Sequence, residues 1–301
     1  MGNTKLKNYL HLHFIVFVWG FTAVLGKLIS VGALSLVWFR MSIAVVLTLI
    51  YIGFKKYSLR VPARTFRLLL VGGLVITLHW LTFFKAIKVS NVSVALATMS
   101  TGAFFTAILE PIWYRRKFKG YEIIFGLIVI FGLYVMLYVE TLFIEGIVLA
   151  LISALLSAIF TLINGKLIQS ERPSAISFYE LGSGVVFLSI YLGVMEKFNS
   201  DFFRLSQNDW LFLVILASVC TAYAFIASVK VMKYISPYTV MLTINLEPVY
   251  GILLAYFILG DSEKMKPMFY VGTVIILTTV IANGILKTKR KFVELDAERE
   301  S

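Results

Sequence analysis

Apolar segments about 20 residues long recur ten times along the 301 residues, and this pattern constrains the fold more than any other feature. About 20 apolar residues in an α-helix cross the hydrocarbon core of a bilayer, and the helix satisfies every backbone hydrogen bond internally. The sequence therefore predicts an all-α polytopic membrane protein with ten transmembrane helices. We expect these helices near residues 9–29, 34–54, 66–87, 92–113, 121–139, 144–168, 175–195, 209–232, 237–259 and 268–287.

The composition excludes an ordinary soluble domain, because 59% of the residues are hydrophobic and only 15% are charged. The net charge of +12 does not indicate a nucleic-acid partner, since the basic residues cluster in short loops between apolar segments. The lone Cys220 lies within an apolar segment, which leaves no disulfide framework and no multi-cysteine metal site. We expect the lipid bilayer as a partner, and no cofactor or metal.

The basic residues also predict the orientation in the membrane. With a cytoplasmic N-terminus, the inside segments carry 20 of the 28 Lys and Arg residues. Cytoplasmic loops are enriched in basic residues. The sequence therefore predicts a multi-pass protein of the inner (plasma) membrane with both termini in the cytoplasm.

An internal repeat divides the chain into two halves. Residues 21–29 and 160–168 are identical at six of nine positions, including a Gly-Lys-Leu-Ile run, and the offset grows to 146 farther along. We expect a first five-helix repeat at 1–140, a second at 141–290 and a charged cytoplasmic tail at 291–301. Because five is an odd number, the second repeat must be inverted, an architecture found in many secondary transporters.

Three motifs carry a family resemblance: Trp19-Gly20 in the first span, Arg40 in the second and Leu246-Glu247-Pro248 in the ninth. With the two five-helix halves, they make the chain resemble the EamA-type branch of the drug/metabolite transporter superfamily over nearly its whole length. The resemblance implies an inner-membrane carrier for small metabolites, often amino acids or related compounds and frequently exported. It also implies a central cavity lined by spans 1, 3, 4, 6, 8 and 9.

The fourth span departs from the family pattern. Many members have a proline near its middle, where this chain has Thr101-Gly102 aligned with Glu247-Pro248. We therefore expect imperfect symmetry between the two central helices.

Glu247 is the strongest candidate for a solute contact, because a carboxylate at mid-depth in a membrane is costly and usually functional. Pro248 should break the hydrogen bonding to Ile244 and let the backbone line a cavity. The alternative is a carboxylate in a structural hydrogen bond. The residues predicted to bind the solute are Glu247, Asn245, Thr101, His79, Trp80, Trp19, Tyr223 and Tyr250.

Three further charged residues are predicted to act as gates or ion pairs. Inversion should place Arg40 and Glu180 in opposite leaflets, so that each needs its own partner and each could guard one mouth of the cavity. Glu110 lies near the cytoplasmic end beside Arg115 and Arg116, where a gating ion pair and a solute contact are both open. For Arg40, a snorkelling or packing role is the alternative.

These features predict a secondary transporter that moves a small organic solute by alternating access. Two modes of transport remain open: coupling to a proton carried by Glu247 or His79, and uncoupled exchange or facilitated diffusion. For His79, the alternative is a neutral ring in a structural hydrogen bond. The sequence has no Walker-type loop and no nucleophile and base motif, so neither direct ATP drive nor enzymatic activity is expected. The rival function is a non-transporting membrane protein, either an intramembrane enzyme or a sensor or scaffold.

Overall fold

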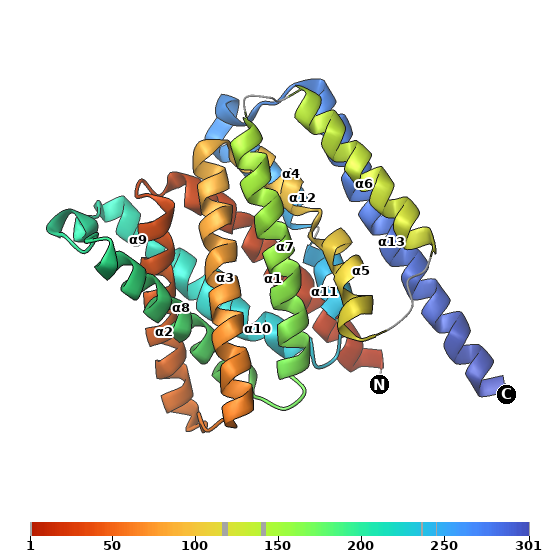
Figure 1. The fold of residues 1–301 in the computed structure, drawn as a ribbon, viewed down its shortest axis with the longest axis horizontal. Helices are drawn as coiled ribbons and strands as arrows, with labels where there is room; N and C mark the ends of the chain where they lie inside the picture. The colour runs from red at the N-terminus through yellow and green to blue at the C-terminus, as the bar shows by residue number, and fades with distance from the viewer. Residues whose placement is uncertain (1, 116–119, 140–142, 236, 245, 301) are drawn as a thin grey trace.

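The computed structural model describes residues 2–115, 120–139, 143–235, 237–244 and 246–300, and within them helices occupy all ten predicted spans (Figure 1). The first half contains α1 (Gly2–Leu28), α2 (Ala33–Lys55), α3 (Ala63–Val89), α4 (Val92–Met99), α5 (Gly102–Trp113) and α6 (Gly120–Val139). The second half contains α7 (Ile144–Leu167), α8 (Pro173–Val194), η2 (Ser200–Phe203), α9 (Gln207–Ala217), η3 (Ser218–Tyr223), α10 (Ala224–Val231), α11 (Pro237–Ile244), α12 (Glu247–Leu259), η4 (Gly260–Glu263) and α13 (Pro267–Glu300).

Three of the ten spans are not single regular helices. The fourth span is divided into α4 and α5, and the ninth into α11 and α12. The eighth span runs through α9, the π-helical segment η3 and α10. Helix α13 continues to Glu300, through most of the segment that the sequence assigns to a separate tail.

Seven helical segments among the described residues are long and apolar enough to cross a bilayer. They are Leu6–Leu28, Ala33–Lys55, Ala63–Val89, Val92–Trp113, Ile144–Leu167, Pro173–Val194 and Gln207–Val231. Two shorter apolar helices, Ile124–Val135 and Pro267–Thr279, belong to the predicted fifth and tenth spans.

The loop between α2 and α3 marks one end of the bundle, which we call the basic end. There the Tyr179 hydroxyl, at the start of α8, donates a hydrogen bond to the Leu59 carbonyl over 2.7 Å. The Arg172 guanidinium also lies 4.7 Å from the centre of the Tyr57 ring. Helices α3 and α8 therefore both begin at the basic end.

Contacts at the opposite end show that the two halves are inverted. The Lys88 ammonium, at the end of α3, donates to the carbonyl of Ile29 just after α1, so α1 runs from the basic end to the opposite end. The Lys85 ammonium lies 3.8 Å from the Glu145 carboxylate, at the start of α7. Helix α7, the counterpart of α1 in the repeat, therefore runs in the reverse direction, as the sequence predicts.

Helices α6 and α13 form a pair at one edge of the molecule, where they pack chiefly on each other (Figure 1). Their contact is close because glycines face each other across it. A Cβ atom added at Gly132 would lie 3.2 Å from the Gly272 carbonyl oxygen. This pair stands apart from the helices that surround the centre of the bundle.

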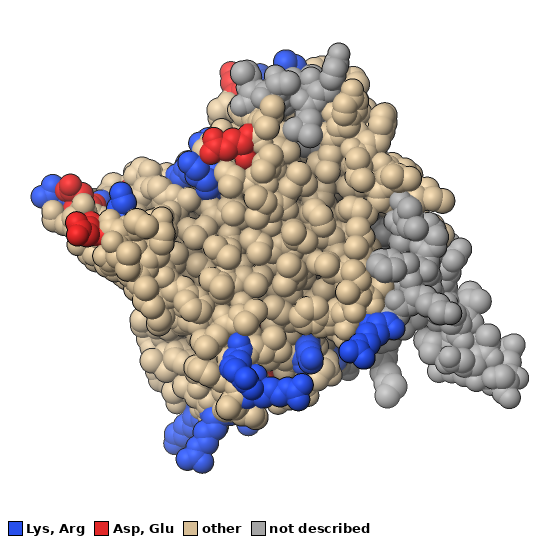
Figure 2. Space-filling view, viewed as in Figure 1, with Lys and Arg blue, Asp and Glu red and all other residues tan. Residues whose placement is uncertain are grey.

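The surface matches a membrane location. Figure 2 shows a broad band without charged side chains across the middle of the viewed face, with Lys and Arg at the lower edge and both signs of charge at the upper edge. The membrane-length helices also expose apolar side chains, including Val71, Leu74 and Leu78 of α3 and Val148 and Ile152 of α7. An apolar girdle between two polar edges is what a bilayer requires.

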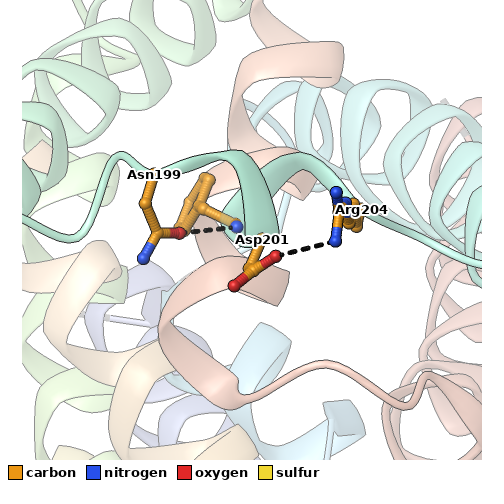
Figure 3. A network of polar contacts seen from close by, with 4 residues as sticks. Asn199, Asp201 and Arg204 are labelled. Atoms are coloured by element: carbon orange, nitrogen blue, oxygen red, sulfur yellow. Dashed lines mark hydrogen bonds and ion pairs between the residues drawn. The ribbon is translucent and has the colours of Figure 1, made fainter.

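The connection between α8 and α9 is ordered by its own polar contacts (Figure 3). The Asn199 side chain accepts a hydrogen bond from the Phe202 backbone N–H over 2.9 Å, and the Arg204 guanidinium lies 3.2 Å from the Asp201 carboxylate. These contacts hold the Phe202 ring stacked on Phe39 of α2, with ring centres 5.3 Å apart. The loop thus covers the beginning of α2 with aromatic rings.

Helices of the two halves pack tightly where α3 meets α8, and this contact yields a prediction. A Cβ atom at Gly73 would lie 2.4 Å from the Glu180 carbonyl oxygen and 1.9 Å from the Ser183 hydroxyl, whereas one at Gly182 would meet nothing within 4 Å. We expect Gly73→Ala to lower stability by about 1–3 kcal/mol through overpacking.

Gly182→Ala is the matched control and should be neutral or slightly stabilising, because alanine is favoured over glycine in helices. The measurement is the thermal melting midpoint of each purified variant in detergent. Equal midpoints for the two variants would contradict the packing described here.

Candidate functional site

The fourth and ninth spans both break in the middle of the bundle, at positions that correspond in the repeat. In the ninth span, α12 begins at Glu247 with Pro248 in its first turn, where the missing N–H is tolerated. In the fourth span the Ser100 and Thr101 hydroxyls donate to the carbonyls of Ala97 and Thr98, over 2.6 and 2.8 Å.

Hydroxyl-to-carbonyl bonds of this kind compete with the regular helical ladder. They interrupt the fourth span without a proline. The two spans therefore break at corresponding positions, but different residues produce the breaks, so the symmetry of the two central helices is imperfect. Two helix breaks at mid-depth expose backbone groups that require a polar cavity or protein partners.

A cavity lies between the two halves at this depth. Its volume is about 80 Å³, which holds a few waters but is well below the roughly 300–1,000 Å³ of typical ligand pockets. It receives side chains from spans 1, 2, 3, 4, 6, 8 and 9, that is, from the six expected spans together with the second. Its lining residues are Trp19, Thr22, Arg40, Ile76, His79, Trp80, Phe83, Met99, Ser157, Phe160, Phe225, Ser228, Met232, Ile244 and Glu247.

Arg40 is the most deeply buried charged side chain of the cavity, with 1% of its surface exposed. Its Nε atom donates to the Thr221 hydroxyl over 2.6 Å, and its guanidinium carbon lies 4.0 Å from the centre of the Trp80 ring. Its Nη1 atom is buried with no hydrogen-bond partner. An unsatisfied buried donor is costly, which makes this atom ready to bind an acceptor on a solute.

The π-helical segment η3 organises this part of the cavity. Its insertion lets the Thr221 hydroxyl reach the Leu216 carbonyl over 2.7 Å while accepting from Arg40. It also directs the Cys220 carbonyl toward the Trp19 indole N–H, which donates to it over 3.2 Å. Short π-helical insertions often occur at functional sites because they redirect individual groups in this way.

Glu247 lines the same cavity from the first residue of α12. A carboxylate there is favoured by the partial positive charge of a helix N-terminus. Arg40 and Glu247 are close enough to interact electrostatically. Among the residues that the structure describes, however, no ion pair joins them.

His79 is held in place by a neighbouring serine. Its Nδ1 atom lies 2.9 Å from the Ser153 carbonyl oxygen and 2.8 Å from the Ser153 hydroxyl, which in turn donates to the His79 carbonyl. The ring also stacks against Phe83 in the cavity wall. Nε2 is therefore the ring nitrogen that can contact a solute.

Three of the predicted solute contacts lie away from the cavity. Thr101 caps the break in the fourth span, and Tyr250 packs its ring against Phe17. Tyr223 is 42% exposed and its hydroxyl lies 2.8 Å from His11 Nε2. Asn245 falls outside the described residues.

Two of the predicted gating residues also lie elsewhere. Glu180 is fully buried and accepts a hydrogen bond from the Asn164 side chain over 3.1 Å, against Gly72 of α3. Glu110 lies in the last turn of α5, close to the basic end. Arg40, by contrast, lines the cavity itself and has the separate partner, Thr221, that inversion requires.

Sequence reasoning missed several cavity residues. Thr22 stands in the recurring segment 21–29, and its Oγ1 atom is buried with no partner other than the nearby sulfur of Cys220. The recurrence of this segment in the second half could have identified Thr22 from the sequence. No sequence pattern identifies Thr221, because only the π-helical insertion brings its hydroxyl to Arg40.

Two buried carboxylates fasten the halves together at the opposite end. Asp209, at the start of α9, accepts from the backbone N–H and the hydroxyl of Ser30, each over 2.6 Å. Glu263, in η4, accepts from the backbone N–H groups of Val92 and Ser93 over 3.1 and 2.8 Å. These charge-assisted bonds tie the two halves together at that end.

The Arg40 anchor generates a stability prediction. Thr221→Val removes the acceptor of a buried Nε–H, so we expect the free energy of unfolding to fall by about 1–3 kcal/mol. Thr48→Val is the matched control, because the Thr48 hydroxyl is buried without any partner and an apolar replacement should be neutral or stabilising. Melting midpoints of both variants in detergent test this, and a Thr221→Val midpoint at or above that of Thr48→Val would refute the anchoring role.

Comparisons with known proteins agree with this geometry. The EamA-like transporter family matches residues 7–138 and 144–284. A solved structure described as "Crystal structure of protein" superposes with a TM-score of 0.67 over 92% of this chain and 96% of that chain, at 14% sequence identity. At that identity, the likeness shows the fold alone.

Two curated relatives are also similar. The uncharacterized transporter YxxF of Bacillus subtilis (strain 168) is 24% identical over 206 residues, which cover 66% of this chain and 63% of the relative. An uncharacterized transporter of Archaeoglobus fulgidus is 29% identical over 152 residues, which cover 50% of this chain and 52% of the relative. The chain thus spans less than two thirds of the length of each of these relatives. With two repeats of the family covering most of its length, the ten-helix chain belongs to the EamA-like transporter family, a family of membrane transporters and not of enzymes.

Proposed function

We propose that this transporter is a secondary carrier that moves a small zwitterionic organic solute, of the amino acid type, across the inner membrane. Family membership supplies the transport activity, and the cavity supports the class of solute. The observation that carries the proposal is that Arg40 and Glu247 line one small cavity and, among the described residues, form no ion pair with each other. Two unpaired opposite charges are matched by a solute that carries both.

A zwitterion satisfies polar groups of the cavity wall that lack partners within the protein. A carboxylate beside Arg40 accepts from Nη1 and from the Thr22 hydroxyl, which are the buried atoms without good partners on the described lining residues. An ammonium group then faces Glu247. Charge-assisted hydrogen bonds of this kind are about twice as strong as neutral ones.

The remaining wall is suited to an apolar or aromatic side chain. Phe83, Phe160 and Phe225 line the cavity, and the Phe160 and Phe225 rings lie 5.3 Å apart between their centres. Rings at this separation offer edges and faces to a flat apolar group. We therefore expect amino acids with apolar side chains to bind better than charged ones, and the cavity of about 80 Å³ to widen when it admits a large side chain.

Alternating access is supported by the arrangement of the halves. The cavity is small, the opposite end is tied by Asp209 and Glu263, and two clefts of about 610 and 400 Å³ open at the basic end. Met232 lines both the cavity and the smaller cleft, so its movement would open a path between them. Inverted halves that rock about a central site would open the two ends in turn.

The basic end is the cytoplasmic end in this proposal, in line with the excess of Lys and Arg there. A path opened at that end would expose the cavity to the cytoplasm, which transport in either direction requires. If transport is coupled to protons, Glu247 is the residue we assign to carry them, because Ser153 already holds His79. Uncoupled exchange needs no change in the charge of Glu247.

The class of solute can be tested by matched ligands. We expect phenylalanine to raise the melting midpoint of the purified protein, since a ligand at about 100 times its Kd stabilises the folded state by about 2.7 kcal/mol. Phenethylamine and 3-phenylpropionate, which lack one charge each, should give much smaller shifts.

Thr22→Val supplies the internal control for this test. It removes a hydroxyl that has no good partner within the protein, so the unliganded midpoint should not fall, while the shift given by phenylalanine should shrink. Equal shifts from all three ligands, or an unchanged shift in Thr22→Val, would argue against recognition of a zwitterion at this site.

A further inference from the structure

A cationic cleft at the basic end lies outside the transport cavity. It has a volume of about 610 Å³ and lies between the first turns of α3 and the last turn of α7. Arg64 and Arg67 of α3 and Lys166 of α7 supply three positive charges. The other lining residues are Thr65, Leu68, Val71, Leu167 and Ser170, two of them with hydroxyls and three apolar.

Within the described part of the chain, the three cations of this cleft have no counter-ion. Among the side chains that the structure describes, no Asp or Glu forms an ion pair with Arg64, Arg67 or Lys166. Three like charges around one hollow repel one another, and an anion placed among them relieves that repulsion. The general excess of basic residues at this end explains why these side chains are positively charged. It does not explain why three of them surround one cleft.

An apolar track leads away from the cleft along α3. Arg67, Val71, Leu74 and Leu78 follow one another at helical spacings of four, three and four residues, so they share one face. The exposed fractions of Val71, Leu74 and Leu78 are 50%, 41% and 41%. Eleven residues of helix rise about 16 Å, which is about half of a hydrocarbon core of about 30 Å.

We propose that this cleft binds the phosphate headgroup of an anionic phospholipid, with an acyl chain lying along Val71, Leu74 and Leu78. The three cations lie at the basic end, and the track runs from them along α3 toward the opposite end, as the headgroup and tail of one leaflet require. Because α3 and α7 belong to different halves, the lipid bridges the halves at the basic end. This inference goes beyond the proposed function and does not depend on the identity of the solute.

Native mass spectrometry of the full chain in detergent tests the proposal. The probes are phosphatidylglycerol and phosphatidylcholine with identical acyl chains. We expect at least about tenfold tighter binding of phosphatidylglycerol, because each basic residue near an anionic headgroup contributes about fivefold in affinity. The variant Arg64→Gln, Arg67→Gln, Lys166→Gln should lose this preference.

The matched control removes three cations from the same end but outside the cleft: Lys55→Gln, Lys56→Gln and Arg60→Gln. It should keep the preference. Loss of preference in the control as well, or equal binding of the two lipids by the wild type, would overturn the proposal. If the triple cleft variant does not fold, Arg67→Gln alone serves, and an unchanged preference in that variant counts against the site.

A second arm distinguishes a lipid from a free anion. Inorganic phosphate and glycerol 3-phosphate carry the charge but no acyl chain, so neither should compete with phosphatidylglycerol at equal concentration. Competition by either compound would identify a free-anion site and overturn the assignment to lipid. Val71→Ser with Leu74→Ser should weaken phosphatidylglycerol binding, whereas the same change at Val186 and Ile190, which are exposed on α8, should not.

Discussion

The burial of one guanidinium in the centre of a membrane protein is the constraint on which the site depends. Removing a charged group from water costs several kcal/mol, and the cost is offset only by well-placed partners. Arg40 has Thr221 for its Nε atom and the Trp80 face beneath its plane, but its Nη1 atom is left unsatisfied. The cavity, the π-helical segment and the acid of the ninth span are all arranged around that group.

The two broken spans show how one geometry arises from different residues. In the ninth span Pro248 removes a donor, while in the fourth Ser100 and Thr101 draw carbonyls away from the ladder. Both breaks fall at the depth of the cavity, where backbone groups have polar surroundings. The two halves are therefore more similar in backbone geometry than in sequence. Their side-chain chemistry differs at this point, because Thr101 stands at the position that corresponds to Glu247.

Much of this structure could be predicted from the sequence because it follows from patterns that a bilayer imposes. Hydropathy located the ten spans, and the odd number of helices in each repeat required the inversion. The cost of charge in a membrane singled out Arg40 and Glu247, which the structure brings to one cavity. That the two work together as a solute site remains a proposal.

The rest depended on local backbone geometry that no periodicity reveals. Tyr223 lies at the right depth, but the π-helical insertion shifts the phase of the eighth span and turns its ring to the surface beside His11. The same insertion brings Thr221 to Arg40. Glu180 accepts a hydrogen bond from Asn164 of the preceding helix. A hydrogen bond of this kind depends on how the helices pack and not on the spacing of the two residues along the chain.

Solute flux into proteoliposomes tests the central claim most directly, namely that this cavity is the transport site. Glu247→Gln retains the shape of the side chain and removes its charge, so we expect flux of a bound amino acid to fall at least about tenfold, as the loss of a charge-assisted hydrogen bond implies. Glu196→Gln, in the exposed loop after α8, should transport at the wild-type rate. Wild-type flux through a folded Glu247→Gln protein would contradict the account.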